Sequence, residues 1–316
     1  MTGEIKKTRS NKYKEIKEES SISKEDIDTE QEEKKPLLPK ILFIIILFLV
    51  LFFIYISLIA TSIVDIKEYK IESDKISSSF HGLKIIHLSD IHYGTTINQK
   101  QLNNIVEKIN NLKPDVIFFT GDLIDKNIVP NDKIKEEIIS SLSKLKCSLY
   151  KYAIYGNEDY DNEFYKEIIT SSDFILLNNE TKLLYYKDDI PIQITGFNSV
   201  DNNPDYSIIN QTTEETSNYQ LYKIILTHEP DSIDNIIKYN PDLVLSGHSL
   251  GGLIKIPFIK PLFLEKGATK YYKDYYKINN TELYISNGLG TSGINARFNN
   301  HPSFNLYRLY KKDSNK

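Results

Sequence analysis

Residues 83–92 read LKIIHLSDIH, a mostly apolar run that ends abruptly in polar residues. A short apolar run of this kind, rich in Ile and Leu, is typical of a buried strand. Apolar residues then recur at helical spacing over residues 102–112, and VIFFT at residues 116–120 indicates a second buried strand. A strand, a helix and a strand in this order predict a βαβ unit, and therefore a layered α/β architecture.

The same alternation continues towards the C-terminus. It predicts a helix at residues 134–145 and strands at residues 149–155, 183–196, 223–226 and 243–246. Residues 275–285 read YYKINNTELYI, which predicts a hairpin closed by the Asn279-Asn280 turn. Because a hairpin is antiparallel and a βαβ unit is parallel, we expect a mixed sheet.

Residues 41–64 contain no charged side chain, and LFIIILFLVLFFIYISLIA within them is apolar on every face of a helix. At a rise of about 1.5 Å per residue such a helix covers about 36 Å, which is enough to cross a bilayer. A buried core helix is the alternative, but all-round apolarity suits lipid better than a half-exposed surface. We therefore predict a transmembrane helix at 41–64, a connector at 65–82 and one folded domain at 83–316.

Residues 1–40 are mostly Lys, Glu, Ser and Asp, a composition typical of a disordered polar tail. A cleavable signal peptide has a shorter apolar stretch close to its start, so we expect an uncleaved anchor. The basic residues that flank the span are Lys34, Lys35 and Lys40 on one side and Lys67, Lys70 and Lys75 on the other. These nearly balance, but the tail adds further basic residues, which favours a cytoplasmic N-terminus and a domain outside the cell membrane.

The composition narrows the classes of partner and of metal site. A chain of 316 residues with a net charge of -4 has no general attraction for nucleic acid, so no nucleic-acid partner is expected. Its single cysteine, Cys147, excludes an internal disulfide framework and a thiolate zinc cluster. Any metal must therefore be held by Asp, Glu, His or Asn side chains.

Polar residues with ligand-type atoms stand where the predicted strands end. They are Ser89-Asp90-Ile91-His92, Gly121-Asp122, Gly156-Asn157-Glu158-Asp159, Thr227-His228 and Gly247-His248. In α/β sheets the crevice beyond the carboxyl ends of the strands binds ligands, so these loops are predicted to converge. One Asp or Asn after a strand is more often a helix cap or a turn residue, but caps do not explain five such groups.

These motifs, D-x-H, GD, GN-x-D, a lone His and GH, resemble in type and order those of the calcineurin-like metallophosphoesterases. The resemblance covers about Leu83 to Tyr310. The stretches HGLKIIHLSDIHYG, LTHEPD, GGLIKIPF and NGLGTSGINARF are most similar to the membrane-associated branch that includes UDP-2,3-diacylglucosamine pyrophosphatase-like enzymes.

The resemblance implies a four-layer αββα sandwich that hydrolyses phosphoesters with two divalent ions, which would be Mn, Fe, Zn or Mg. Asp122 would bridge the two ions, because a carboxylate has two oxygens. The ligands implied for one metal site are Asn157, His228 and His248, and those for the other are Asp90 and His92. The ions would polarise the phosphoryl oxygens and acidify a bridging water for in-line attack.

Two departures from the family pattern fall on this chemistry. The family reads GNH where this chain has Glu158, so a histidine that would protonate the leaving oxygen is missing. The family reads GHxH where this chain has Leu250, so the Asp90/His92 site lacks a ligand and is expected to bind its ion weakly. A working enzyme with water in the gap, a one-metal protein and an inactive descendant all remain open.

Other motifs have competing interpretations. Residues 247–251 match the G-x-S-x-G elbow of serine hydrolases, but a β-branched, proline-containing stretch follows where a helix is needed, and only His301 remains for a triad. No P-loop motif exists, which excludes a P-loop nucleotidase. His87 is predicted to be a core or supporting histidine, and Asp125 a helix cap rather than a ligand contact. The tyrosines at 271, 272, 275 and 276 are expected to pack in the hairpin, with lipid headgroups as the alternative.

The sequence thus predicts a membrane-anchored, divalent-metal-dependent phosphoesterase. The expected substrate is a phosphorylated small molecule or lipid with a phosphoester or pyrophosphate bond, and lipids and nucleotide sugars near the bilayer are the candidates. No catalytic side chain beyond the metal ligands is assigned. The alternative is a catalytically impaired domain that binds a phosphorylated ligand or partner.

Overall fold

The computed structural model describes residues 37–159, 163–187, 190–211, 216–261 and 263–312. The polar tail predicted at residues 1–40 therefore lies outside the described residues up to residue 36. The chain divides into two compact units between Leu51 and Phe52, and each is described by itself.

The first described element is the helix α2, Leu37–Ile54, which has no buried residue and continues as a π-helical turn, η1, Tyr55–Ile59. Together they form a 23-residue apolar helix that is long enough to cross a membrane by length and composition. The helix begins before the predicted start at residue 41, because Pro39 is tolerated within a first helical turn. It ends at Ile59, before the predicted end at residue 64.

Among the described residues, two six-stranded sheets form the domain, and both are mixed. The first sheet has, in spatial order, β1 (Asp65–Ser73), β12 (Ser303–Lys311), β2 (Lys84–Leu88), β3 (Val116–Phe119), β4 (Tyr150–Ala153) and β5 (Ile175–Leu176). Strands β2 to β5 are parallel, whereas β12 runs antiparallel to β2 and parallel to β1. The βαβ unit predicted from residues 83–120 is confirmed as β2, α3 and β3.

The second sheet has the order β10 (Tyr275–Ile278), β11 (Thr281–Ile285), β9 (Leu243–Ser246), β8 (Tyr222–Leu226), β7 (Ile192–Gly196) and β6 (Glu180–Leu184). Strands β7, β8, β9 and β11 are parallel, and β10 and β6 are antiparallel edge strands. The predicted hairpin is confirmed as β10 and β11, with Asn279 in the left-handed conformation that such a turn requires.

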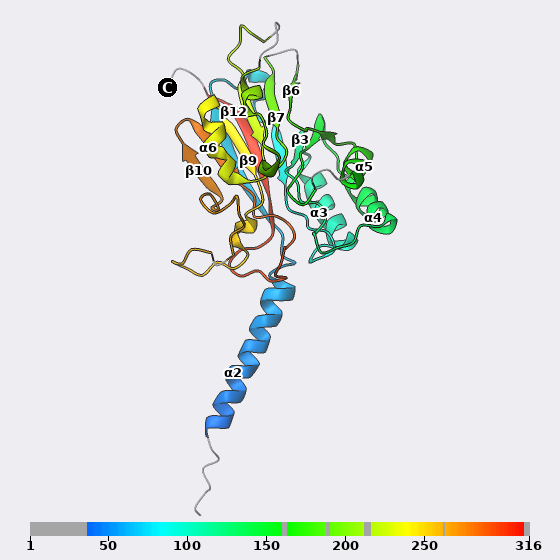
Figure 1. The fold of residues 1–316 in the computed structure, drawn as a ribbon, viewed down its shortest axis with the longest axis vertical. Coiled ribbons are helices and arrows are strands. Elements are labelled where there is room, and N and C mark those ends of the chain that lie inside the picture. Colours follow the sequence, from blue (N-terminus) through cyan, green and yellow to red (C-terminus); the bar gives the residue numbers. More distant parts are fainter. Residues whose placement is uncertain (1–36, 160–162, 188–189, 212–215, 262, 313–316) are drawn as a thin grey trace, which may run out of the picture. The chain divides into compact units, whose positions relative to one another are not determined.

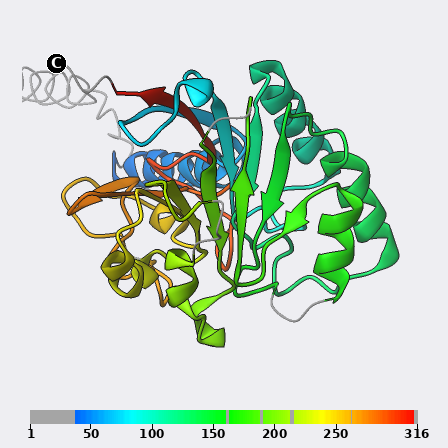
Figure 2. The same cartoon turned by 90° about the horizontal axis from the view of Figure 1, so that it is seen from above.

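Helices cover the outer faces of the two sheets (Figures 1 and 2). The α-helices of the domain are α3 (Gln99–Leu112), α4 (Asp132–Leu142), α5 (Glu163–Ser171) and α6 (Ile233–Ile236). Short 3-10 helices are η2 (Ser78–Phe80), η3 (Val200–Asn202), η4 (Tyr206–Asn210), η5 (Pro230–Ser232), η6 (Ile237–Tyr239) and η7 (Leu250–Gly252). Helix α3 starts at a capping box of Asn98 and Gln101, which satisfies its first free N–H groups.

Three apolar cores separate the layers. One lies between the sheets and joins residues such as Phe118 on β3 to Tyr222 on β8. A second joins the first sheet to α3, α4 and α5, and the third joins the second sheet to α6. This arrangement is the predicted αββα sandwich.

The prediction of a connector at residues 65–82 is corrected by the structure. Its first half forms β1, and residues 78–80 form η2. All nine residues of β1 pair with β12, which begins at Ser303. Residues 65–73 are rich in charge, as an exposed edge strand can be, and their partner is remote in sequence. Strands β5 and β12 and helix α5 were likewise absent from the sequence-based expectations.

Candidate metal centre

The predicted loops meet at one edge, where parallel strands of both sheets end. Gly247, after β9, comes so close to the loop after β2 that a Cβ atom there would lie 1.8 Å from Ser89 Oγ. Gly121, after β3, has φ of 90° and approaches the backbone of Gly156, after β4. Glycine is needed at both positions, since any side chain would separate the loops that carry the candidate ligands.

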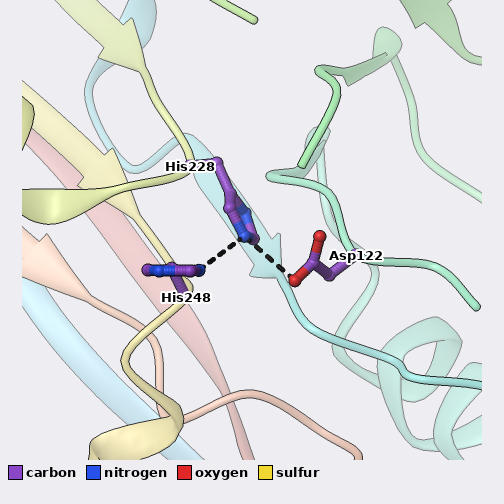
Figure 3. A group of neighbouring side chains, drawn as sticks. All are labelled: Asp122, His228 and His248. Carbon is purple, nitrogen blue, oxygen red and sulfur yellow. Dashed lines mark hydrogen bonds and ion pairs between the residues drawn. The ribbon is translucent and has the colours of Figure 1, made fainter. Parts of the chain in front are cut away.

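Asp122, His228 and His248 form the first group of potential ligands, and all three are buried. His228 Nε2 lies 3.1 Å from Asp122 Oδ2 and 3.2 Å from His248 Nδ1. Figure 3 shows His228 between the other two side chains, with its ring nitrogen facing both. The three side chains come from the ends of β3, β8 and β9.

Backbone carbonyls fix the tautomers of both imidazoles. His228 Nδ1 lies 2.6 Å from the carbonyl oxygen of Thr120, and His248 Nε2 lies 2.8 Å from that of Lys266. A carbonyl only accepts, so each of these nitrogens carries the proton when the ring is neutral. His228 Nε2 and His248 Nδ1 then face each other and Asp122 with lone pairs, an arrangement that requires a shared proton or a cation.

Asp90, His92 and Asp122 form a second group around the same carboxylate. His92 Nε2 lies 3.9 Å from Asp90 Oδ1 and 3.7 Å from Asp122 Oδ2. Asp90 also accepts from the backbone N–H of His248 at 3.0 Å, which ties the two sheets together at the site. Asp122 is shared by both groups, as a bridging ligand would be.

The backbone is strained at this edge. Asp90, His92, Asp122 and His248 all adopt positive φ angles, between 42° and 63°. Non-glycine residues adopt this conformation rarely, and such strain gathers at functional sites. The loops therefore present these side chains at a cost that packing elsewhere must offset.

Glu158 and Asp125 lie behind His92, on the side away from Asp122. His92 Nδ1 is 3.4 Å from Glu158 Oε2 and 3.8 Å from Asp125 Oδ2. His92 Nδ1 and Asp125 Oδ2 are buried without a hydrogen bond in the described part of the chain. Two carboxylates beside one ring nitrogen can orient the ring and keep its proton on Nδ1, leaving Nε2 for a ligand bond.

The interpretation of Asp125 as a helix cap is therefore wrong. Asn131 caps α4, through a hydrogen bond from the N–H of Ile134. Asp125 instead accepts from the N–H of Asn127 and turns its other oxygen to His92. Sequence reasoning missed this supporting role, although the short spacing of Asp122 and Asp125 after one strand is a signal for it.

The loop after β4 contributes Asp159 more clearly than Asn157. Asn157 is exposed, and its neighbour Glu158 donates its N–H to Asp122 Oδ1 at 3.1 Å. Asp159 is buried and accepts from the N–H groups of Asp122, Leu123 and Gly156. The structure thus brings five of the six predicted ligands into contact and leaves the side chain of Asn157 at the rim; ligation by all six stays a prediction.

Charge at the site follows from burial and from the neighbouring groups. Burial raises the pKa of Asp159 to about 7, with the charge of Asp122 adding to the effect. Burial opposes a proton on His92, but Glu158, Asp122 and Asp90 overcome it and raise its pKa to about 9. Burial also opposes the charge of Asp122, yet the histidines, His228 first, lower its pKa.

Leu250 occupies the place where the family pattern has a second histidine. It is buried with φ of 47°, and its carbonyl accepts from Asn300 Nδ2 at 2.7 Å. It lines a small cavity of about 100 Å³, whose other walls are the apolar Leu253, Phe263 and Ile294 and the polar Ser249, Glu265 and Ser292. Because the Leu250 side chain has no atom that can bind a metal, the prediction that the Asp90/His92 site lacks one protein ligand stands.

A buried arginine, Arg297, holds the neighbouring loop. Its guanidinium donates to the backbone carbonyls of Leu250, Asn287, Gly288, Gly290 and Asn300. Burial lowers its pKa to about 9. The sequence reasoning had not singled out Arg297, since its partners are carbonyl groups that no motif records.

The structure also tests the predictions for the serine-hydrolase elbow and for His87. Ser249 leads into the 3-10 turn η7 instead of an α-helix, and His301 contacts Asp65, so the serine-hydrolase elbow is not formed. His87 is buried between Thr120 Oγ1, at 2.9 Å, and the hydroxyl of Tyr307. It supports the core, as expected.

Comparison with known proteins decides the family. The model for calcineurin-like phosphoesterases matches residues 83–252. This chain belongs to the calcineurin-like phosphoesterase family. The chain is 32% identical over 247 residues to the uncharacterized metallophosphoesterase YkuE of Bacillus subtilis, and the match covers 77% of this chain and 84% of the relative.

More distant relatives extend the comparison. A transmembrane protein with a metallophosphoesterase domain from Danio rerio is 27% identical over 250 residues, and the match covers 73% of this chain and 54% of the relative. Among solved structures, the NAD nucleotidase of Haemophilus influenzae is 14% identical with a TM-score of 0.43, covering 66% of this chain and 45% of that one. The family uses divalent metal ions, which the His and Asp groups of the site suit in donor type.

Proposed function

We propose that this chain is a membrane-anchored phosphoesterase that needs divalent metal ions held by Asp90, His92, Asp122, Asn157, His228 and His248. One observation carries the proposal. His228 Nε2 lies within 3.2 Å of both Asp122 Oδ2 and His248 Nδ1, which come from two other loops, and backbone carbonyls hold both imidazoles in that orientation. Buried lone pairs that face each other are unfavourable unless a shared proton or a cation joins them, and a metal cation can accept all three ligand atoms at once.

The residues of the chain do the positioning. Bound divalent ions would supply polarisation of the phosphoryl oxygens and acidification of water. Thr120 and Lys266 orient the imidazoles of His228 and His248 through their carbonyl oxygens. Asp159 holds the loop that carries Asp122, and Asp125 and Glu158 hold the ring of His92.

The two metal positions are expected to differ in affinity. Asp122, His228 and His248 are in contact, whereas the Asp90/His92 position has Leu250 as a neighbour in place of a ligand. One ion per chain should survive dialysis of the full-length protein, and a second should bind only at high added metal. Metal analysis after dialysis measures this directly, and two tightly held ions would show that the ligand count is wrong.

Substitutions assign the positions. His228→Ala should remove the tightly held ion, and His92→Ala should mostly affect the weak one, with turnover of a chromogenic aryl phosphodiester lost in parallel. His81→Ala is the matched control, because His81 is exposed and contacts the ring of Tyr310. Loss of metal and turnover in the control as well would contradict the assignment, and circular dichroism separates this from unfolding.

A second candidate function rests on the same two departures. Glu158 makes its contacts with His92 and Lys126, and Leu250 offers no donor atom, so an impaired domain that binds a phosphorylated ligand is the alternative. Binding of inorganic phosphate to the metal-loaded protein without turnover of several phosphoesters would favour it.

The substrate and the membrane setting are also part of the proposal. The apolar helix and the transmembrane relative support an anchor, and the balance of basic residues favours a cytoplasmic N-terminus with the domain outside. A phosphorylated lipid or a nucleotide sugar, as for UDP-2,3-diacylglucosamine pyrophosphatase-like enzymes, is the substrate class that suits a site held near a bilayer.

A further inference from the structure

The loop at residues 253–261, which follows η7, exposes apolar side chains. Ile256, Phe258 and Ile259 are all exposed, and Phe258 is fully accessible to solvent. Phe263, two residues beyond the loop, is exposed too. Figure 1 shows this segment, gold in the colour sequence, extending away from the sheets. Single exposed apolar residues are normal on a protein surface, but a cluster of them in one short loop marks a contact surface.

The tip of the loop is a hydrogen-bonded turn with a backbone conformation that is unusual for its residue type. Ile256 accepts from the N–H of Ile259 at 3.2 Å, which closes a turn around Pro257 and Phe258. Phe258 has φ of 67°, a conformation for which glycine is the ordinary residue. A phenylalanine at this position presents its ring to the surroundings instead of to a core.

The charge around the loop is the opposite of that of the chain. Residues 253–277 contain six lysines and two carboxylates, in a chain whose net charge is -4. Lys255, Lys260 and Lys273 line a cavity of about 660 Å³ together with Ile256 and Phe258. Lys260 also lies over the ring of Tyr272, with Nζ 5.6 Å from its centroid. Exposed apolar side chains beside lysines and a tyrosine suit a membrane interface. The apolar groups can contact acyl chains while the lysines contact anionic headgroups.

The loop adjoins the point where the apolar helix enters the domain. The ring of Phe52 packs against Phe298 at 5.3 Å, and the carbonyl of Ile56 accepts from the N–H of Arg297 at 2.9 Å. The carbonyl of Phe298 accepts in turn from the N–H of Lys255 at 2.9 Å. The last turns of the helix and the base of the loop are thus joined through residues 297–298.

Sheet topology places the metal centre at the same edge. Strand β1 starts with Asp65 opposite Ser303, and β12 pairs antiparallel with β2, with Asn305 opposite His87. The chain therefore enters the domain at the carboxyl end of β2, where Asp90 and His92 follow. From Ile59 to Asp65 an extended chain spans at most about 20 Å, so the last turn of the helix, which ends at Ile59, is tethered within that distance of this edge.

We propose that the 253–261 loop is a second membrane contact, in which Ile256, Phe258 and Ile259 enter the bilayer interface while nearby lysines face anionic phospholipid headgroups. The inference rests on the proposed membrane anchor and not on catalysis. It turns the metal-centre edge of the domain towards the lipid surface, so that a lipid-borne phosphoester can reach the site without leaving the bilayer.

The chain has no tryptophan, which makes a single introduced tryptophan a specific reporter. The full-length protein carrying Phe258→Trp is reconstituted in vesicles of about three parts phosphatidylcholine to one part phosphatidylglycerol. The acyl chains are brominated either near the headgroup (high-brominated) or near the bilayer centre (low-brominated). We expect a blue-shifted emission and quenching several-fold stronger by the high-brominated lipid. Tyr219→Trp is the matched control, because Tyr219 is exposed and precedes β8, at the opposite end of the second sheet.

A third variant distinguishes the loop from the anchor. Phe48→Trp, within the apolar helix, should be quenched best by the low-brominated lipid. Quenching of Phe48→Trp with Phe258→Trp as unresponsive as Tyr219→Trp would overturn the loop contact and leave the anchor standing. If neither responds, anchor and loop contact both fail.

The lysines give a second readout. Replacing phosphatidylglycerol by neutral lipid, or introducing Lys260→Gln with Lys273→Gln, should reduce the quenching of Phe258→Trp and leave that of Phe48→Trp unchanged. Equal quenching in neutral and anionic vesicles would show that the lysines do not face headgroups and would overturn that half of the proposal.

Discussion

His228 and His248 hold opposite tautomers, and one carbonyl decides each. His228 donates a hydrogen bond from Nδ1 to the carbonyl oxygen of Thr120, and His248 donates one from Nε2 to that of Lys266. Without its acceptor, a turned His228 ring would point a proton instead of a lone pair at Asp122, and a turned His248 ring would do the same at His228. At the scale of single residues, the site depends as much on these backbone acceptors as on the candidate ligands.

The low pKa of His87 predicts that the folded state loses stability in acid. Burial lowers its pKa to about 3, whereas in an unfolded chain it titrates near 6.5. The unfolded state therefore binds the extra proton between these values, and stability falls as the pH drops through that window. At pH 5 the loss from this one residue is about 2 kcal/mol.

His87→Gln should flatten this part of the pH dependence. Urea midpoints of the two proteins, followed by circular dichroism with chelator present, measure the difference between pH 7 and pH 5. Because the carboxylates titrate equally in both proteins, the comparison isolates His87. An unchanged slope in the variant would contradict the assignment.

Leu250→His with Glu158→His tests the two departures from the family pattern. Leu250→His restores a donor atom beside the weak metal position, and Glu158→His supplies a group with a pKa near 6.5. General acid assistance is typically worth about 100-fold to 10,000-fold, so phosphodiester turnover should rise well beyond assay error. The gains should be non-additive, since a proton donor helps little before both ions position the substrate.

Two results would contradict this reconstruction. A double variant that holds two ions yet stays silent on several phosphoesters would favour the impaired binding domain. An unaltered protein that is already as fast as the double variant would show that Glu158 and a water suffice. Glu158→His also removes a contact of His92, so Glu158→Gln is the control for that loss.

At the scale of elements, the loops after β3 and β4 are held together by one carboxylate. Asp159→Asn replaces an acceptor oxygen with an NH₂ group that faces backbone N–H groups of Asp122, Leu123 or Gly156. We expect a loss of about 1–3 kcal/mol in the free energy of unfolding and weaker metal binding, because Asp122 would no longer be held in place. Thermal unfolding and metal titration measure the two effects.

Asp132→Asn is the control for this prediction, because Asp132 is an exposed residue in the first turn of α4. It should change stability by less than about 0.5 kcal/mol. A stable Asp159→Asn protein with unchanged metal affinity would show that the loop keeps its shape without the carboxylate.

The elements differ in how well the sequence predicts them. β2, α3 and β3 follow from burial patterns within one contiguous stretch, and so does the β10–β11 hairpin. β1 is charged and half exposed, and its partner β12 is more than two hundred residues away. Local periodicity carries no information on pairing between such remote segments. The sequence therefore predicts a connector where the structure has β1.

At the scale of the whole molecule, orientation across the membrane is the open prediction. Lysines 34, 35 and 40 and the basic residues of the tail favour a cytoplasmic N-terminus. Protease added to intact cells should therefore remove the domain that follows the apolar helix. A domain that resists protease until the cells are lysed would reverse the orientation, and a cytoplasmic marker protein controls for leakage.

The sequence by itself determined the layered α/β class, the apolar helix and the set of polar residues at the strand ends, because each is written in a contiguous stretch with its own period or motif. Only the tertiary structure decided how those residues are used. The acceptor of His228 is Thr120, 108 positions away, and Glu158 and Asp125 meet His92 from two other loops. Contacts between remote segments depend on how the strands order and pair, and this is set by packing of the whole domain rather than by any local pattern.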